Sequence, residues 1–220
     1  MTPTTDFSIR TLIGGYDNNF TYIITCNITR RQIIIDASVK WEMVKPYINS
    51  YPITLVITHT HKDHIAYLKE FALARPNLKI IGHQNSEKLF SNYNFQLIQD
   101  SQSFNIGQIN IEAIYTPGHY FDSICYLIGN VLFTGDTLFV GRTGRVLSPK
   151  SNIVDLYDSV YNKLLLLPHN TRIYPGHNYG KKKSITIGDN IKISPLLQAN
   201  TFNDFKLKMT EYEKMRSPGS

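Results

Sequence analysis

The sequence predicts an α/β (α+β) fold in which two β-sheets pack on each other and helices cover their outer faces. Short apolar or alternating segments, which are typical of strands, come in one run near the N-terminus and in a second run from residue 108 onward. Segments with helical patterns lie between and after these runs instead of following every strand. This order favours a sheet-on-sheet core with helices outside over a simple parallel sheet.

Turn residues divide the first half of the chain into strands and helices. Gly14-Gly15-Tyr-Asp-Asn-Asn19 and Asn27-Ile-Thr-Arg30 are expected to be turns. The expected strands are Phe7–Ile13, Phe20–Cys26, Gln32–Ile35, Ile53–Thr58 and Lys79–Ile81. The expected helices are a segment through Trp41, Val44 and Ile48 that Asp36-Ala-Ser38 caps, His64–Ala74 ending before Pro76, and a short helix at Asn85–Phe90.

The second half repeats this pattern of strands followed by helices. The expected strands are Gln108–Tyr115, Ser123–Ile128, Val131–Phe133 and, as the last one, Thr171–Tyr174, with a hairpin turn at Gly129-Asn130. Ser151 is expected to cap a helix with one apolar face, formed by Val154, Tyr157, Val160, Tyr161, Leu164 and Leu165. Because no linker or low-complexity break divides the chain, residues 1–220 are expected to form a single domain. Residues 180–220 are expected to be a short C-terminal loop and one helix, Phe202–Met215.

The composition is that of a soluble globular protein. Hydrophobic residues make up 42% of the 220 residues and aromatic residues 12%, which is wrong for a disordered chain. No run approaches the roughly 18 apolar residues of a membrane helix, and the start Met1-Thr-Pro-Thr-Thr-Asp6 lacks the features of a secretory signal. We therefore expect a cytoplasmic protein with no membrane partner. Cys26 and Cys125 lie in apolar runs and are expected to be buried, outside any disulfide framework or metal site.

The chain is basic, with 23 Lys and Arg against 17 Asp and Glu and a net charge of +6. These side chains are mostly scattered, which argues against a nucleic-acid partner. The one dense run is Lys181-Lys-Lys183. It is either a solvated loop or a contact to an anionic substrate.

The stretch Leu55-Val-Ile-Thr-His-Thr-His-Lys-Asp-His64 is the strongest chemical signal in the sequence. His59 and His61 alternate with Thr60, so on an extended chain end both imidazoles leave the same side. Asp63 and His64 follow where a helical pattern begins. Three imidazoles and a carboxylate at a strand-to-helix turn suit Zn²⁺ or Fe²⁺. The alternative interpretation is a solvated polar turn.

Three further predicted strands end in a residue that can bind a metal. They are followed by His119 in Tyr115-Thr-Pro-Gly-His119, Asp136 in Phe133-Thr-Gly-Asp136 and His177 in Tyr174-Pro-Gly-His177. A Pro-Gly-His turn by itself is more often only a turn, but four such strand ends occur in this chain. Two metals about 3.5–4 Å apart need roughly six or seven ligands with one shared anion. Asp136 is the natural bridge, because a carboxylate has two oxygens and an imidazole offers one lone pair.

The ordered set from His59 to His177 resembles that of the metallo-β-lactamase superfamily. Phe133-Thr-Gly-Asp-Thr-Leu-Phe-Val140 and Tyr174-Pro-Gly-His-Asn-Tyr179 resemble its glyoxalase II (hydroxyacylglutathione hydrolase) and persulfide dioxygenase branch. The resemblance runs from about Tyr22 to Tyr179. It implies a four-layer αββα sandwich with the metals at one edge between the sheets. It also implies a first metal site of His59, His61 and His119, a second of Asp63, His64 and His177, and Asp136 as the bridge.

The resemblance also implies how the substrate is held. Arg145 matches a basic residue that holds glutathione in glyoxalase II, although Leu147 stands where an aromatic is expected. Tyr179 matches a tyrosine that contacts glutathione; its alternative interpretation is a plain surface aromatic. Arg142 and Lys182 are further expected contacts to the anionic end of the substrate. Two departures from the family pattern are Tyr120-Phe-Asp-Ser123, which predicts a bulkier pocket floor, and a short segment after Tyr179, which is closer to the persulfide dioxygenases.

These residues predict a metal-dependent hydrolase similar to glyoxalase II, which cleaves the thioester of an acylated glutathione or a related thiol through a metal-bound hydroxide. Asp63 is expected to serve as ligand and water orienter, and Asp136 as the shared catalytic anion. Two divalent ions are expected, zinc first, with iron or manganese as alternatives. The main alternative is a glutathione persulfide dioxygenase that uses a single Fe²⁺ held by His59, His119 and Asp136. Weaker alternatives are a lactonase, a nuclease and a non-catalytic binding module.

Overall fold

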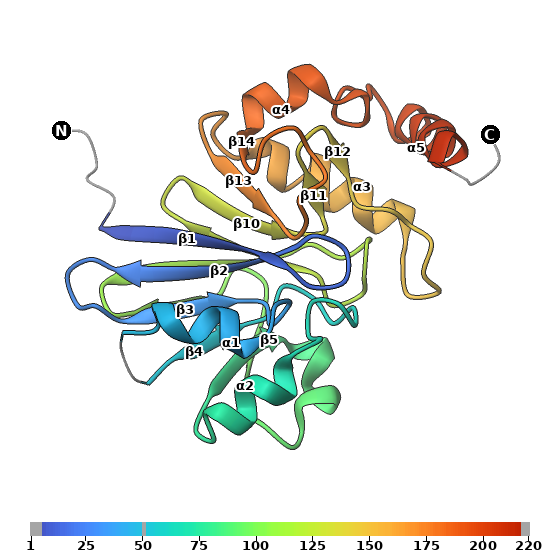
Figure 1. Cartoon of the computed structure of the whole chain (residues 1–220). Coiled ribbons are helices and arrows are strands. Elements are labelled where there is room, and N and C mark those ends of the chain that lie inside the picture. The colour runs from blue at the N-terminus through green and yellow to red at the C-terminus, as the bar shows by residue number, and fades with distance from the viewer. Residues whose placement is uncertain (1–5, 50–51, 217–220) are drawn as a thin grey trace.

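Two six-stranded sheets form the centre of the protein (Figure 1), in a computed structural model that describes residues 6–49 and 52–216. The strands of the first sheet, in spatial order, are β1 (Phe7–Gly14), β2 (Asn19–Cys26), β3 (Gln32–Ile35), β4 (Thr54–Val56), β5 (Lys79–His83) and β6 (Asn94–Ile98). Those of the second are β14 (Ile185–Thr186), β13 (Arg172–Pro175), β10 (Val131–Gly135), β9 (Ile124–Ile128), β8 (Ile109–Tyr115) and β7 (Ser103–Ile106). A small hairpin of β11 (Leu138–Phe139) and β12 (Arg142–Thr143) lies beside them.

Alternating side chains on the strands build the core between the two sheets. On β2, Phe20, Tyr22, Ile24 and Cys26 belong to the inter-sheet cluster, whereas Ile23 belongs to the cluster on the outer face. This period of two is what an extended strand imposes when both of its faces are covered. The β10 strand follows the same rule, with Val131 and Phe133 inside and Leu132 outside. The expected sheet-on-sheet core is therefore confirmed.

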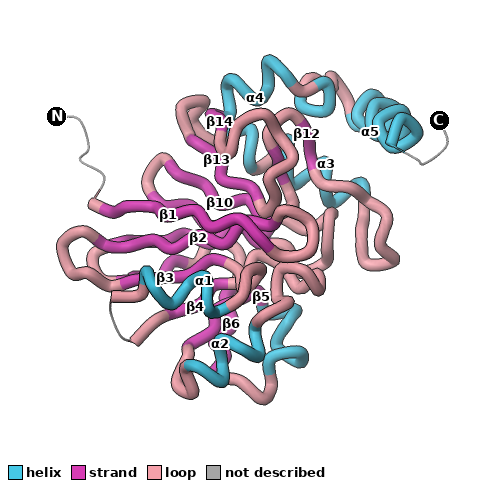
Figure 2. The backbone as a smooth tube through the Cα atoms, in the orientation of Figure 1, coloured by secondary structure: helices cyan, strands magenta, loops and turns pink. Residues whose placement is uncertain are grey.

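Helices cover both outer faces and complete four layers, αββα (Figure 2). The first sheet carries α1 (Trp41–Val44), α2 (Leu68–Ala74) and the 3₁₀ helices η1 (Lys45–Tyr47) and η2 (Gln84–Phe90). The second carries α3 (Ile153–Tyr161), α4 (Ile187–Ile193), α5 (Phe202–Arg216) and the 3₁₀ helices η3 (Leu164–Leu166) and η4 (Pro195–Leu197). The expected four-layer architecture is confirmed.

The helix expected from His64 begins four residues later, at Leu68. Part of the backbone between these residues is bonded to Ala37, which follows β3, instead of forming helical hydrogen bonds. Ala37 N–H donates to the His64 carbonyl at 2.9 Å, and Tyr67 N–H donates to the Ala37 carbonyl at 3.0 Å. Asp63 and His64 therefore lie in a turn and not at a helix N-terminus.

Two expected helix caps have other roles. Lys40 precedes α1, and Asp36 instead accepts hydrogen bonds from the backbone N–H and hydroxyl of Thr58, at 2.8 and 2.7 Å. Asn152 caps α3 by accepting from two backbone N–H groups, and the Ser151 hydroxyl donates to the His119 carbonyl at 2.8 Å. The α3 helix thus starts one residue later than expected. Its buried face also differs from the expected one, because Val154 is exposed and Leu156 is buried.

The segment after residue 180 holds more than the expected loop and single helix. It forms β14, α4 and η4 before α5, so Thr171–Tyr174 is not the last strand. The α5 helix itself is found where it is expected. Cys26 and Cys125 are free and buried, as predicted. Within the described ranges, no helix combines the length and the apolar character needed to cross a membrane.

Candidate metal centre

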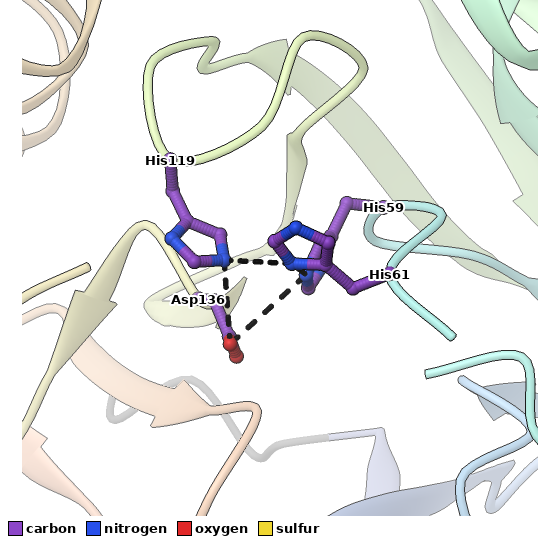
Figure 3. A group of neighbouring side chains, drawn as sticks. All are labelled: His59, His61, His119 and Asp136. Atoms are coloured by element: carbon purple, nitrogen blue, oxygen red, sulfur yellow. Dashed lines mark hydrogen bonds and ion pairs between the residues drawn. The ribbon is translucent and has the colours of Figure 1, made fainter. Parts of the chain in front are cut away.

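The seven predicted ligands come together at one edge of the two sheets. They follow the carboxyl ends of β4, β8, β10 and β13. Two groups have their ligand atoms within 4.8 Å of one another: His59, His61, His119 and Asp136 in one, and Asp63, His64 and His177 in the other. Figure 3 shows the first group, with the three imidazoles converging above the Asp136 carboxylate. The folding of the chain thus brings together residues up to 118 positions apart in the sequence.

In the first group, three imidazole nitrogens face one another at short range. His61 Nδ1 lies 3.0 Å from His59 Nε2 and 3.0 Å from His119 Nε2. Asp136 Oδ2 lies 3.6 Å from His119 Nε2 and 4.0 Å from His59 Nε2. Burial lowers the pKa of all three histidines, that of His61 to about 4. They are therefore neutral near pH 7, and a neutral imidazole is the form that binds a metal.

In the second group, the Asp63 carboxylate faces two imidazoles, and Asp136 of the first group approaches both rings. His177 Nε2 lies 3.2 Å from His64 Nε2 and 3.2 Å from Asp63 Oδ2. Burial alone would lower the pKa of His177, but the charge of Asp136 raises it to about 9. Burial also acts to lower the pKa of His64, but the charges of Asp136 and Asp36 outweigh it and raise this pKa well above its ordinary value. The raised pKa of both histidines shows that the carboxylates favour positive charge at this position, which a divalent cation would supply.

Asp136 lies between the two groups and fits the role of a bridge. Its Oδ2 is 3.2 Å from His177 Nε2 and its Oδ1 is 3.2 Å from His64 Nε2. Among the described residues, Oδ1 is a buried atom with no hydrogen-bond partner, and its near neighbour is His64 Nε2 at 3.2 Å. An unsatisfied buried carboxylate oxygen is costly, and a cation would satisfy it. The five histidines and the second carboxylate, Asp63, that surround it form a donor set that suits two divalent metal ions.

Three of the five imidazoles are also held on the side away from the metal groups. His64 Nδ1 lies 2.7 Å from Asp36 Oδ2, which is buried. His119 Nδ1 and His177 Nδ1 lie 2.8 Å from the carbonyl oxygens of Arg145 and Asp17. Such partners fix the ring orientation and leave the other nitrogen for the metal.

Asp36 and Asn19 are site residues that the sequence interpretation missed. Asp36 follows β3 directly, so the rule that identified the candidate ligands, a His or Asp at a strand end, could have identified it. Asn19 opens β2 and its side-chain amide donates to Asp63 Oδ2 at 2.8 Å. No sequence signal points to Asn19, because its contact depends on how β2 meets residues 176–177.

Two glycines allow the strand ends to approach each other. A Cβ on Gly176 would lie 2.3 Å from Asp136 Oδ1 and 2.6 Å from His64 Cε1. Gly118, before His119, has a φ of +129°, and a Cβ there would lie 2.2 Å from the Leu156 backbone nitrogen. A glycine at 118 therefore lets the turn before His119 approach the α3 backbone closely, and Gly176 has a comparable role beside the second metal group.

The turn after His119 fills the space beside the first group, as its sequence predicts. The Tyr120 ring packs on the His61 ring, with centroids 4.0 Å apart. Asp122 is buried and accepts hydrogen bonds from the Thr60 hydroxyl at 2.5 Å and the Thr60 backbone N–H at 3.3 Å. Because Thr60 lies between His59 and His61, Asp122 fixes the loop that carries both histidines.

A small cavity of about 140 Å³ opens beside the metal groups. It is lined by Asp17, His119, Asp136, Phe139, Arg142, Arg145, Tyr179 and Arg216. Three of the four residues expected to hold the substrate are therefore at the site. The fourth, Lys182, lies in the exposed loop before β14 and is not among the described residues that line this cavity, so its role stays a prediction.

The aromatic and basic residues of the cavity contact one another. The Tyr179 ring stacks on the ring of His177, with centroids 4.6 Å apart and planes 3° apart, and its hydroxyl donates to Asp17. Burial and this hydrogen bond raise the pKa of Tyr179 well above its ordinary value, so the phenol stays neutral. The Arg142 guanidinium lies 4.2 Å above the Tyr179 ring. Arg216, from α5, was not expected from the sequence.

Comparison with known proteins identifies the family. The model of the metallo-beta-lactamase superfamily matches residues 15–177. The chain belongs to the metallo-beta-lactamase superfamily. The predicted family and fold are thus confirmed, and the seven candidate ligands lie inside the matched region.

Two relatives and one solved structure illustrate the similarity. The chain is 31% identical over 181 residues to a probable hydroxyacylglutathione hydrolase, glo2, of Schizosaccharomyces pombe, covering 77% of this chain and 68% of that protein. It is 30% identical over 217 residues to PksB of Bacillus subtilis, a probable polyketide biosynthesis zinc-dependent hydrolase, covering 93% and 88%. The crystal structure of ETHE1 from Myxococcus xanthus superposes with a TM-score of 0.81 at 28% identity, covering 96% and 92%.

These findings support the predicted enzyme class. The relatives named above include hydrolases, and one of them is named as zinc-dependent. The described residues of this chain contain a candidate metal-binding site in the position that the superfamily match spans. The chain is accordingly a metallo-beta-lactamase-fold enzyme of the hydrolase type.

Proposed function

We propose that the protein is a metal-dependent thioester hydrolase similar to glyoxalase II, acting on an acylated glutathione or a related thiol. The observation that carries this proposal is the pair of ligand groups sharing Asp136 beside a cavity with basic walls. The names of several relatives, which are hydroxyacylglutathione hydrolases, support the same choice.

The residues of the centre have distinct roles in this proposal. When bound, two divalent ions supply a coordinated water of lowered pKa and a Lewis acid for the thioester carbonyl. His59, His61 and His119 would hold one ion, Asp63, His64 and His177 would hold the other, and Asp136 would contribute to both. The side chain of Asp63 is 28% exposed, more than that of Asp136 at 9%, so water reaches it more readily. Asn19 holds this carboxylate and thereby sets its orientation.

The leaving group needs little help from the protein. A thiol has an ordinary pKa near 8.5, so a thiolate departs near neutral pH without a strong general acid. The remaining task is to hold the thiol in place. Arg142, Tyr179 and Arg216, on one side of the cavity, are suited to an anionic or polar thiol, because guanidinium groups bind carboxylates and the tyrosine offers a flat face.

A glutathione persulfide dioxygenase is the second candidate function. The similarity to the ETHE1 structure, over 96% of this chain, favours it. His59, His119 and Asp136 supply two imidazoles and one carboxylate within 4.8 Å of one another, the set that suits a single Fe²⁺ with open positions. Both candidate reactions use the same residues and differ in the metal and in the need for oxygen.

One experiment separates the two reactions. The metal-free protein is loaded separately with Zn²⁺ and with Fe²⁺, and each form is assayed for cleavage of a glutathione thioester under nitrogen and for oxygen uptake on a glutathione persulfide. We expect thioester cleavage without oxygen in the zinc form. Oxygen uptake in the iron form only, with no thioester cleavage in either form, would overturn the proposed hydrolase.

A further inference from the structure

The C-terminal helix α5 forms part of the wall of the active-site cavity. Phe205 and Met209 on this helix are buried in the cluster that covers the second sheet. Tyr212, Glu213 and Arg216 follow at positions that lie on the same side of a helix. Because Phe205 and Met209 are packed in this cluster, the C-terminal end of α5 lies beside the β12 region. Tyr212 there contacts Arg142, and Glu213 contacts Arg145. Arg216 lines the cavity directly.

Glu213 forms an ion pair with the guanidinium of Arg145. Arg145 Nε donates to both carboxylate oxygens of Glu213, at 3.0 and 2.8 Å, and Arg145 Nη2 donates to Oε2 at 2.5 Å. The Glu213 side chain is 18% exposed and that of Arg145 is 39% exposed, so the pair lies at the rim of the cavity and not in bulk solvent. A two-pronged contact of this kind is also how an arginine holds the carboxylate of a ligand.

The other two cavity arginines are bound differently. Arg142 Nη1 donates to the Tyr212 hydroxyl at 2.7 Å, and Arg216 Nη1 approaches the same hydroxyl at 3.3 Å. A hydroxyl group leaves the positive charge of both arginines unneutralised. Within residues 6–49 and 52–216, no carboxylate forms an ion pair with either of them. Among the described residues, the wall thus has two arginines that no carboxylate pairs with and one, Arg145, that is paired with Glu213.

We propose that Glu213 is a specificity-determining residue, which competes with a substrate carboxylate for Arg145 and so weakens the binding of thioesters whose thiol carries that carboxylate. This inference rests on the proposed thioester hydrolysis. A substrate carboxylate that reaches Arg145 must displace Glu213, whereas one that reaches Arg142 or Arg216 need not. The enzyme therefore favours thiols with fewer carboxylates than the two of glutathione.

The test compares a charged and a neutral thioester. The substrates are S-lactoylglutathione, with two carboxylates, and S-acetyl-N-acetylcysteamine, with none, on the zinc-loaded full chain. Glu213→Gln should lower KM for the glutathione thioester about 3- to 10-fold with little change in kcat, since only uniform binding is altered. KM for the neutral thioester should not move. Glu211→Gln, an exposed position on the same helix, is the matched control and should leave both values unchanged.

A double-mutant cycle assigns the effect to Arg145. In an Arg145→Ala background, Glu213→Gln should no longer change KM, because the competition has lost its target. An unchanged or raised KM in Glu213→Gln alone, with the glutathione thioester, would overturn the inference. Glu213→Ser serves as a second variant, and circular dichroism with zinc content confirms that each variant is folded and loaded.

A binding measurement keeps the inference separate from the proposed function. If the wild-type enzyme cleaves neither thioester, the proposed function fails, but calorimetry with reduced glutathione on the zinc-loaded protein still reports on Glu213. We expect the Kd for glutathione to fall about 3- to 10-fold in Glu213→Gln and to stay constant in Glu211→Gln. An equal Kd in wild type and Glu213→Gln would reject the competition.

Discussion

The Nδ1 atom of His64 lies 2.7 Å from the Oδ2 atom of Asp36, and both side chains are at most 2% exposed. The same carboxylate accepts from the Thr58 hydroxyl, and Thr58 Oγ1 lies 3.2 Å from His59 Nδ1. One buried acid therefore orients a histidine in each of the two ligand groups. It connects the end of β3 to the loop after β4, where the metal chemistry of the chain is concentrated.

Asp36→Asn should weaken metal binding about 10- to 100-fold, since outer partners of this kind tune ligand basicity and ring orientation. The effect should be largest for the ion held by His64. Competition of the protein with a chromophoric zinc chelator measures both affinities. Asp158→Asn, an exposed position on α3, is the matched control. Equal zinc affinity in Asp36→Asn and wild type would contradict this role of Asp36.

Gly176→Ala should prevent two ions from binding together. The added Cβ would lie 2.3 Å from Asp136 Oδ1, so the bridging carboxylate or the turn has to move. Elemental analysis after dialysis against zinc should show fewer ions per chain than in wild type. Gly188→Ala in α4 is the control, because its nearest side-chain or backbone neighbour is 3.1 Å away and alanine is favoured in helices. Full zinc occupancy in Gly176→Ala would be inconsistent with the observed packing.

Asp122→Ala should lower stability as well as metal affinity. The change leaves the hydroxyl and the N–H of Thr60 without their buried acceptor, at a cost of about 1–3 kcal/mol. The loop from His59 to His61 then loses its support, so zinc should bind more weakly. Urea unfolding of the metal-free protein gives the first quantity and zinc competition the second. A variant with unchanged values in both measurements would show that Thr60 is held by other contacts.

His83 should make stability fall as the pH drops below its ordinary pKa. Its ring stacks on Tyr115, its Nδ1 accepts from the Asn85 N–H, and burial lowers its pKa from 6.5 to about 4. The unfolded chain therefore binds a proton between pH 6.5 and 4 that the folded chain does not. Stability is fully present above pH 6.5 and declines by about 1–2 kcal/mol toward pH 4.

The measurement for His83 is urea unfolding at pH 7, 6, 5 and 4. His83→Asn preserves a side-chain cap without a titrating group, so its free energy of unfolding should fall less steeply over this range. His169→Asn, at an exposed position, should follow the wild-type slope. The same slope in His83→Asn and wild type would remove His83 from the pH dependence.

Nine of the fourteen described strands and the ligand candidates were predictable because both follow from local patterns, whereas β6, β7, β11, β12 and β14 were not predicted. Alternating or continuous apolar runs gave β1, β2, β3 and β8 within one or two residues, and His or Asp at strand ends marked all seven ligand candidates. What could not be predicted depends on contacts between distant segments. Asp36 was taken for a helix cap because a strand-end acid has the same local signature in either role.

The start of α2 and the pairing of Glu213 show the same limit. A helical pattern begins at Ile65, but the backbone of Ala37 forms hydrogen bonds with His64 and Tyr67. The sequence near residue 65 does not indicate this contact, because Ala37 lies far away in the chain. Arg145 was expected to bind substrate from its place after the bridging aspartate. Its partner Glu213 lies 68 residues later, so only the packing of α5 reveals the contact.

The central claim is that seven residues hold two metal ions that share Asp136. Crystals grown with Zn²⁺ and measured at the zinc absorption edge test it directly. We expect two anomalous peaks about 3.5–4 Å apart, with the ligand atoms of His59, His61 and His119 within about 2.0–2.3 Å of one, those of Asp63, His64 and His177 at that distance from the other, and Asp136 touching both. Peaks elsewhere on the surface, or no peak within reach of Asp136 at full zinc saturation, would contradict the account.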